Sequence, residues 1–293
     1  MLQKPKGKLL IIGGHEEKGI SGEGLDILKK ENVGTHFAIL HELIAKVPKN
    51  DHRIEIIATA SSMPKATDEM YIAAIKNAGF GNTEILKLEN EEQTNSWEAI
   101  KRVRKAHAVF FTGGDQKKLC SILKGTKILK AIKNKYLTDE NFIVAGTSAG
   151  AMSIPEIVIT GGIIEEALLK GDLDTGTGLD FIGKIIIDTH FIKRGRFARL
   201  AHAITINPTC LGIGLGEDSA LIISNGNEAE CRGSGMTILI DGTGIKATNV
   251  NYADKFTPVV VENLKINIMA SGCKYLIKEK KFIIGKNLIR SKK

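Results

Sequence analysis

Residues 142–151 read FIVAGTSAGA, an apolar run that passes directly into a glycine-rich turn. The apolar part, 142–145, is typical of a buried strand in a parallel sheet. The turn at 146–150 has the pattern G-x-S-x-G, which in nucleophile elbows holds a serine on a strained turn between a strand and a helix. The stretch therefore predicts a strand, a tight turn and a helix, with Ser148 in the turn.

Short apolar runs alternate with amphipathic stretches around this unit. The apolar runs are 9–12, 54–58, 84–86 and 109–111, and the amphipathic stretches are 35–45, 68–78, 95–104 and 119–129. This alternation predicts a mainly parallel central sheet with helices on both faces. The pairs Gly13-Gly14 and Gly113-Gly114 would then lie with Ser148 at the carboxyl ends of strands, where such sheets bind ligands. The first pair lacks the spacing of a phosphate-binding loop, so nucleotide binding is not expected.

The sequence changes character after Pro208. Short apolar runs are separated there by Gly, Asn and Asp, which predicts antiparallel strands. The expected fold is therefore α/β, with a mainly parallel central sheet, helices on both faces and an antiparallel β C-terminal portion. We expect a single domain over 1–293, made of an α/β core at 1–207 and a β-rich portion at 208–293.

The composition limits the class of protein. Hydrophobic residues make up 43% and charged residues 25% of the 293 residues, which is typical of a globular chain and excludes general disorder. No apolar run approaches the ~20 residues that a membrane span needs, and the N-terminal stretch lacks the apolar core of a secretion signal. We therefore expect a cytoplasmic protein with no membrane contact. The four cysteines and seven histidines have no metal-ligand spacing, and neither a metal nor an organic cofactor is expected.

Most of the net charge of +8 lies at the C-terminal end of the sequence. Residues 274–293 contain eight basic residues and one acid, whereas the remainder is nearly neutral. The apolar runs 275–277 and 282–284 around the lysines predict a hairpin whose charges block edge-to-edge pairing. The alternative is a non-enzymatic protein whose basic tail binds nucleic acid. Because nucleic-acid binders usually spread their basic residues over a face, we expect no nucleic-acid partner.

Ser148 would need a base and an orienting acid if it were a nucleophile. His190 follows the apolar strand 185–188 and stands in a dense set of polar residues. Glu217 and Asp218 follow a glycine-rich strand, and either could orient the imidazole. The alternative is a serine that only N-caps a helix, together with a structural histidine and an ordinary acidic loop.

Neighbouring groups could complete this chemistry. The N–H of Ala149 follows the serine at the start of a helix, and the N–H of Gly114 is a candidate second donor to an oxyanion. Gln116 could contact a substrate, although its segment could equally be a plain turn. His202 is a competing candidate for the base.

Five segments have an order and spacing that point to one family. They are Ile12 to Gly14, Gly113 to Gln116, Gly146 to Ala151, Asp188 to Phe191 with Arg194, Arg196 and Arg199, and Gly214 to Ala220. Together they resemble the cyanophycinase family, and the likeness extends over nearly the whole chain. Cyanophycinases belong to a serine peptidase family that also contains the aspartyl dipeptidase peptidase E. The resemblance implies a fold like that of the class I glutamine amidotransferases and a homodimer.

The resemblance implies a role for each matching residue. Ser148 would be the nucleophile, His190 the general base and Glu217 the acid of a catalytic triad. The backbone N–H groups of Gly114 and Ala149 would bind the oxyanion. The residues implied to bind substrate are Gln116, Asp188, Arg194, Arg196 and Arg199.

The resemblance also implies the substrate. Cyanophycin is a polyaspartate with arginine joined to each side-chain carboxyl, and the expected activity is exopeptidase release of β-Asp-Arg dipeptides. Arginines bind carboxylates through bidentate contacts, and either Asp188 or the Glu16-Glu17 pair could receive a substrate guanidinium. Thr189 and Gly216 depart from the family pattern. The alternative is a related hydrolase of Asp-containing dipeptides or isopeptides that does not act on the polymer.

Overall fold

The computed structural model describes residues 4–14, 52–62, 80–162 and 168–285, together with 69, 71–73, 75–76 and 288. The helix predicted at 35–45 and the Glu16-Glu17 pair lie outside these residues, as does part of the helix predicted at 68–78.

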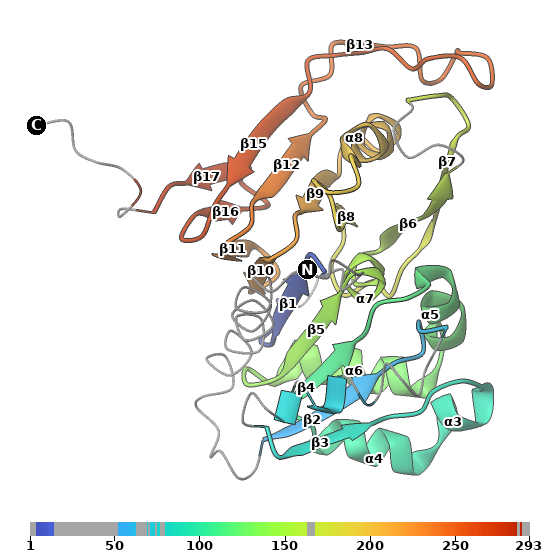
Figure 1. Ribbon diagram of the computed structural model, residues 1–293, viewed down its shortest axis with the longest axis vertical. Helices are drawn as coiled ribbons and strands as arrows, with labels where there is room; N and C mark the ends of the chain where they lie inside the picture. The colour runs from blue at the N-terminus through green and yellow to red at the C-terminus, as the bar shows by residue number, and fades with distance from the viewer. Residues whose placement is uncertain are drawn as a thin grey trace, which may run out of the picture.

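A nine-stranded mixed sheet has the order β17-β16-β11-β10-β1-β5-β4-β2-β3 (Figure 1). Its parallel half consists of β1 (Lys8–Ile12), β5 (Ile143–Thr147), β4 (Ala108–Phe111), β2 (Arg53–Ile57) and β3 (Asn82–Ile85). Its antiparallel half consists of β10 (Ser219–Ser224), β11 (Glu228–Gly233), β16 (Lys274–Leu276) and β17 (Lys281–Ile283). The α/β fold is as predicted, but the sheet is mixed, because the C-terminal strands extend it beyond β1.

A second sheet of four strands lies in the upper part of Figure 1. Its strands, in spatial order, are β15 (Lys265–Met269), β12 (Thr237–Asp241), β9 (Leu211–Leu215) and β8 (Ile185–Asp188). Helix α8 (Phe197–Ile206) packs closely on it, since a Cβ added to Gly212 would lie 2.7 Å from Ile204 Cγ1. The strand predicted before His190 therefore forms outside the central sheet. An apolar run predicts that a strand is buried and does not specify which strand it pairs with.

Strands from both sides of residue 207 pair with one another. In the central sheet β10 lies beside β1, and in the second sheet β9 lies beside β8. Two smaller antiparallel pairs are β6 (Ile157–Gly162) with β7 (Leu173–Thr177) and β13 (Ala247–Thr248) with β14 (Val261–Glu262). The division of the chain at residue 207 stays a prediction.

Capping side chains determine where the helices between the strands begin. The helix predicted at 95–104 begins two residues later as α4 (Trp97–Lys105) and follows α3 (Glu91–Asn95), because Ser96 caps α4. The helix predicted at 119–129 is divided into α5 (Gln116–Leu123) and α6 (Lys127–Thr138). Gly125 has φ 79° between them, a conformation that favours glycine, and the hydroxyl of Thr126 caps α6.

Each face of the central sheet has its own apolar core. Alternate residues of β1 point to opposite faces, so that Leu9 and Ile11 join one cluster while Leu10 and Ile12 join the other. Side chains of α4, α5 and α6 cover the first face, and Ile75, which lies in a helical segment, covers the second. Full burial of each large aliphatic side chain contributes about 1.5–3 kcal/mol. Helices on both faces are therefore confirmed for the described residues.

The predicted C-terminal hairpin is also confirmed. Strands β16 and β17 pair antiparallel, with Tyr275 opposite Phe282 and a turn at 277–280 between them. Strand β17 is the outer strand of the sheet, and Lys281 on it is exposed. A charged edge of this kind disfavours pairing with another chain.

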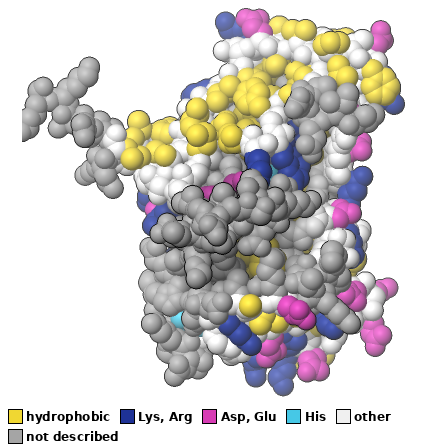
Figure 2. All heavy atoms as spheres, viewed as in Figure 1, with side chains coloured by type: hydrophobic (Ala, Val, Ile, Leu, Met, Phe, Trp, Pro, Cys, Tyr) yellow, Lys and Arg dark blue, Asp and Glu magenta, His cyan; other side chains and the backbone are white. Residues whose placement is uncertain are grey.

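Hydrophobic side chains gather on the upper part of the face in Figure 2. Exposed hydrophobic side chains of the described residues include Ile266 and Ile268 on β15, the edge strand of the second sheet. Among the described residues, no helix has both the length and the apolar character that a membrane crossing requires.

Candidate active site

Ser148 stands on a tight turn between β5 and α7 (Ala149–Ser153). Its backbone has φ 50° and ψ −121°, a conformation that is rare for a residue with a side chain. The flanking glycines are required sterically, because a Cβ on Gly146 would lie 2.7 Å from Gly150 C and one on Gly150 would lie 2.2 Å from Phe111 O. The Ser148 side chain makes no capping hydrogen bond to α7. Its hydroxyl instead points toward a histidine.

The structure brings Ser148, His190 and Glu217 together in a row. Ser148 Oγ lies 3.0 Å from His190 Nε2, and His190 Nδ1 lies 3.3 Å from Glu217 Oε1. His190 follows β8 and Glu217 follows β9, so these neighbouring parallel strands deliver both side chains to the same edge of the second sheet. Both imidazole nitrogens thus have a partner, an arrangement in which a histidine can take the hydroxyl proton.

The end of β1 joins the two sheets beneath this row. The His190 N–H donates to Gly13 O at 2.9 Å, and the Ser148 N–H donates to Ile12 O at 3.3 Å. Gly14 has φ 94°, and a Cβ added to it would lie 2.5 Å from the His190 ring. Only glycine fits at this position without moving the imidazole. The sequence pattern marked the glycine pair, but its contact with His190 depends on the tertiary structure.

Burial and nearby charges have opposite effects on His190. Burial lowers the pKa of the imidazole below its ordinary value, and the hydrogen bond and charge of Glu217 raise it. The charges of Arg196 and Lys193 lower it further. Lys193 Nζ lies 3.6 Å from Glu217 Oε1, the same oxygen that faces the imidazole. The sequence pattern does not single out Lys193, because only the folded chain places it beside the acid.

We expect hydrolytic activity to rise with pH through a midpoint below 6.5, the ordinary pKa of histidine, because the base must be neutral to accept a proton. In Lys193→Met, one charge that lowers this pKa is lost, so the midpoint should move to higher pH. The side chain of Lys193 is 51% exposed, so salt should reduce the shift. The measurement is kcat/KM against pH at low and high salt, with Lys193→Arg as the charge-conserving control. An unchanged midpoint in Lys193→Met at low salt would contradict the expectation.

The two predicted oxyanion donors belong to neighbouring strands. Ala149 begins α7 directly after Ser148, and Gly114 follows β4, which pairs with β5. A Cβ on Gly113 would lie 3.3 Å from Ser148 Cβ, so the glycine pair runs beside the serine. Gly114 itself has φ 136° and packs against Ala60 O, which leaves no room for a side chain. The binding of an oxyanion by these N–H groups stays a prediction.

The residues predicted to bind substrate fall into two groups. Gln116 and Arg194 are partly exposed. Gln116 Nε2 donates to Ile159 O on β6 at 2.9 Å, so this amide nitrogen already holds a backbone carbonyl. The Arg194 side chain lies near Glu217, and burial together with the charges of Arg196 and Arg199 lowers its pKa.

The second group is buried. Asp188 is fully buried, and Arg196 and Arg199 are 6% and 9% exposed. The Asp188 carboxylate accepts hydrogen bonds from both arginines. These three side chains therefore bind one another inside the fold. Their contact with a substrate stays a prediction.

His202, the competing base, lies in α8. Its side chain is buried, its Nε2 has no hydrogen-bond partner among the residues that the structure describes, and burial lowers its pKa. The imidazole nitrogen within hydrogen-bond distance of Ser148 Oγ is Nε2 of His190. Within the described part of the chain, no group of three or more His, Cys, Asp or Glu side chains could hold a metal ion.

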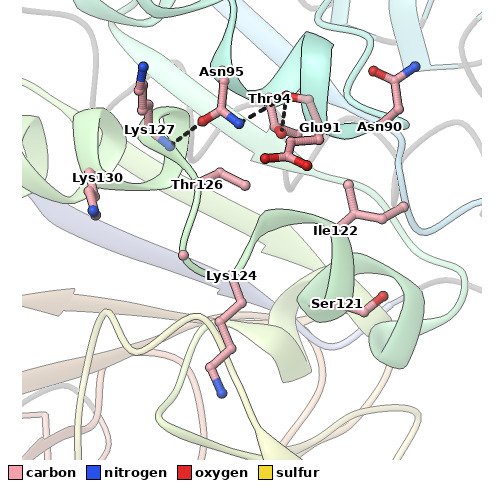
Figure 3. A pocket seen from close by; sticks show the side chains of 11 residues that line it. Asn90, Glu91, Thr94, Asn95, Ser121, Ile122, Lys124, Thr126, Lys127 and Lys130 are labelled. Carbon is pink, nitrogen blue, oxygen red and sulfur yellow. Dashed lines mark hydrogen bonds between the residues drawn. The ribbon is translucent and has the colours of Figure 1, made fainter.

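A surface hollow of about 670 Å³ lies between α3, α5 and the start of α6 (Figure 3). Its lining includes Lys124 and Lys130 and none of the predicted site residues. Asn95 accepts a hydrogen bond from the Lys127 N–H and donates one to Glu91 O. These contacts join the beginning of α6 to α3, so this amide has a structural role.

Comparison with known proteins assigns the class. The model of peptidase family S51 matches residues 29–230. The cyanophycinase of Trichormus variabilis is 30% identical over 273 residues, which cover 93% of this chain and 86% of that protein. The cyanophycinase of Geminocystis herdmanii is 30% identical over 275 residues, which cover 94% and 95%. The crystal structure of a peptidase from an acI-B1 actinobacterium has a similar fold, with a TM-score of 0.60 and 19% identity over 92% of this chain and 96% of that chain.

These matches define a peptidase. The chain belongs to peptidase family S51, and the resemblance to cyanophycinases that the five sequence segments carry is confirmed. The similarity to the actinobacterial structure supports the fold alone.

Proposed function

We propose that the protein is a serine-type peptidase in which Ser148, His190 and Glu217 act as a catalytic triad. The observation that carries this proposal is the continuous row of contacts at 3.0 and 3.3 Å on a strained strand-to-helix turn. A structural serine at the start of a helix would cap the helix, whereas this hydroxyl contacts an imidazole that also faces a carboxylate.

In the proposed mechanism Ser148 Oγ attacks the substrate carbonyl carbon while His190 Nε2 accepts its proton. Glu217 orients the imidazole and stabilises the cation that forms. The N–H groups of Gly114 and Ala149 stabilise the oxyanion; loss of one such donor typically costs about 10²–10³ in kcat. His190 then protonates the leaving amine, and water hydrolyses the acyl-enzyme.

We further propose that the substrate is cyanophycin, cleaved to β-Asp-Arg dipeptides. The support is the similarity to cyanophycinases over nearly the whole chain and the basic side chains of Lys193 and Arg194 beside the triad. These basic side chains could bind the carboxylate of a substrate unit, and the carboxylate of Glu217 lies near them. We expect the protein to act in the cytoplasm, and the homodimer stays a prediction.

The test compares two substrates. Purified protein should release β-Asp-Arg from cyanophycin and should hydrolyse an α-linked Asp dipeptide more slowly, because the α-dipeptide lacks the guanidinium that each unit of cyanophycin carries. Product release is measured by chromatography, with Ser148→Ala as the control for contaminating peptidases. Cleavage of the α-dipeptide without release of β-Asp-Arg would contradict the cyanophycinase proposal. It would favour the Asp-dipeptide hydrolase, for which the departures at Thr189 and Gly216 are the specific observation.

A further inference from the structure

We propose that Ser219 is a positioning residue, whose hydroxyl restrains the turn that carries Glu217 so that the carboxylate stays within reach of His190. Glu217 lies in the turn at 217–218 between β9 and β10, where the chain passes from the second sheet to the central sheet. Ser219 is the first residue of β10. The proposal deepens the proposed function and rests on it, because it concerns how the acid of that reaction meets its base.

The contact between Glu217 and His190 leaves little room for movement. Glu217 Oε1 lies 3.3 Å from His190 Nδ1, and a separation of about 3.6 Å no longer counts as a hydrogen bond. The Glu217 side chain is 24% exposed, so neighbouring atoms do not enclose it completely. A long side chain of this kind loses rotamer freedom when it is held in one place. The contact therefore depends on a backbone that presents the carboxylate at the correct distance.

The hydroxyl of Ser219 closes this turn from inside the fold. Ser219 is fully buried, and its Oγ donates to Gly216 O at 2.7 Å. This bond joins the residues on either side of Glu217 and Asp218. Asp218 has φ 56°, in the left-handed region that residues with a side chain rarely adopt. Such a conformation persists only where the surrounding contacts restrain it, and the Ser219 hydroxyl supplies one of these contacts.

Gly13 ties the same turn to the backbone of the base. Its N–H donates to Ser219 O at 2.9 Å, and its carbonyl accepts the His190 N–H at 2.9 Å. A Cβ added to Gly13 would lie 1.9 Å from Gly216 O, the oxygen that accepts the Ser219 hydroxyl. One residue directly after β1 therefore contacts both the turn of the acid and the backbone of the base. A shift of this turn would change the distance from Glu217 to the imidazole.

Main-chain bonds hold the other side of the turn. The Gly235 N–H donates to Asp218 O at 3.0 Å, and the Gly216 N–H donates to Met236 O at 3.0 Å. A substitution at Ser219 leaves these groups in place. We therefore expect variants at Ser219 to fold and to shift the turn by a small amount.

A titration of the His190 imidazole tests this positioning without any substrate. Glu217 raises the pKa of His190 through its hydrogen bond and charge, whereas burial and the charges of Arg196 and Lys193 lower it. In Ser219→Ala the carboxylate should lie farther from the imidazole, so the midpoint of the His190 titration by NMR should move to lower pH. The signal is assigned by its absence in His190→Gln. In Ser219→Thr a hydroxyl can still donate to the same carbonyl, and the midpoint should stay at the parent value. An unchanged midpoint in Ser219→Ala would overturn the proposal.

The kinetics of cyanophycin hydrolysis separate positioning from substrate binding. In Ser219→Ala we expect kcat to fall by about 10- to 100-fold, with KM within about twofold of the parent value, since this side chain is fully buried. In a Glu217→Ala background the same substitution should cause no further loss, because the hydroxyl acts through the carboxylate. Losses that multiplied in the double variant, or a rise in KM alone, would contradict the proposal.

Thr83 provides a matched control for the loss of a buried hydroxyl. It is 4% exposed on β3, the outermost strand of the central sheet, and its Oγ1 donates at 2.9 Å to the carbonyl three residues before it. Thr83→Val should lower the temperature of unfolding about as much as Ser219→Ala does, while kcat and the His190 titration stay at the parent values. If Ser219→Ala does not fold, Ser219→Cys replaces it, because a thiol fills the position and donates only weakly. Equal kcat in Ser219→Cys and Ser219→Thr would then contradict positioning.

Failure of the proposed function would give a different result. If the parent protein hydrolyses neither cyanophycin nor an α-linked Asp dipeptide, or if Ser148→Ala retains turnover, the peptidase mechanism is wrong. The His190 titration still decides whether Ser219 keeps Glu217 beside the imidazole, because it needs no substrate. The positioning role alone fails if the parent is active, Ser148→Ala is inactive, and Ser219→Ala matches the parent in both kcat and titration.

Discussion

Ser148→Ala is expected to abolish hydrolysis while leaving the fold intact. In the proposed mechanism, Ser148 Oγ is the protein atom that forms a covalent bond to the substrate. Removal of a triad member in serine peptidases typically costs about 10⁴–10⁶ in kcat. The substitution leaves the close backbone packing at Gly146 and Gly150 unchanged, so alanine should occupy the same turn. The measurement is the initial rate of dipeptide release, together with thermal unfolding of both proteins.

Ser153 provides a matched control for this variant. It lies on the same short helix, is buried and donates its hydroxyl to Ala149 O at 2.8 Å. Ser153→Ala should lose about 0.5–1.5 kcal/mol of stability and retain turnover. Near-parent turnover in Ser148→Ala would show that the nucleophile has been assigned wrongly.

His190→Ala is expected to be about as damaging as Ser148→Ala, and the double variant should be little worse than either. The residues of a triad act as a unit, so their losses do not add. The imidazole that lies 3.0 Å from Oγ is the group that accepts the hydroxyl proton in the proposed mechanism. The measurement is kcat for the two single variants and the double variant. Losses that multiplied in the double variant would mean that the two residues act independently.

His202→Ala tests the competing assignment of the base. His202 is buried in α8, where removal of its ring should lower stability and leave the pH dependence of kcat/KM in place. An inactive, folded His202→Ala beside an active His190→Ala would reverse the assignment.

The elbow is the element that could be predicted most completely from sequence. Strand β5, the turn and α7 are consecutive in the chain, so their residues suffice to specify the unit. The ends of the helices were less predictable. Where Ser96 separates α3 from α4, and where Gly125 separates α5 from α6, depends on small differences in local hydrogen bonding. The helix predicted at 95–104 begins two residues later, whereas the helix predicted at 119–129 is divided in two and its second part continues to Thr138.

Strand partners were less predictable still. The apolar run at β8 indicated burial, but its pairing with β9 in a second sheet depends on α8 and on strands that come later in the chain. For the same reason, the substrate role that the resemblance implies for Asp188, Arg196 and Arg199 did not anticipate that the three would bind one another. Side chains eight and eleven residues apart meet there only because β8 and α8 pack together.

Apolar periodicity predicted the α/β class and local sterics predicted the turn at Ser148, because both act between near neighbours in the chain. The family and the choice of Glu217 as the acid came from the resemblance of five sequence segments. Tertiary structure alone decided that Gly14 lies under the His190 ring, that Lys193 stands beside Glu217, and that Arg199 is buried against Asp188. These contacts join segments from two sheets. Their geometry follows from how the sheets pack on each other, and no short stretch of sequence contains that information.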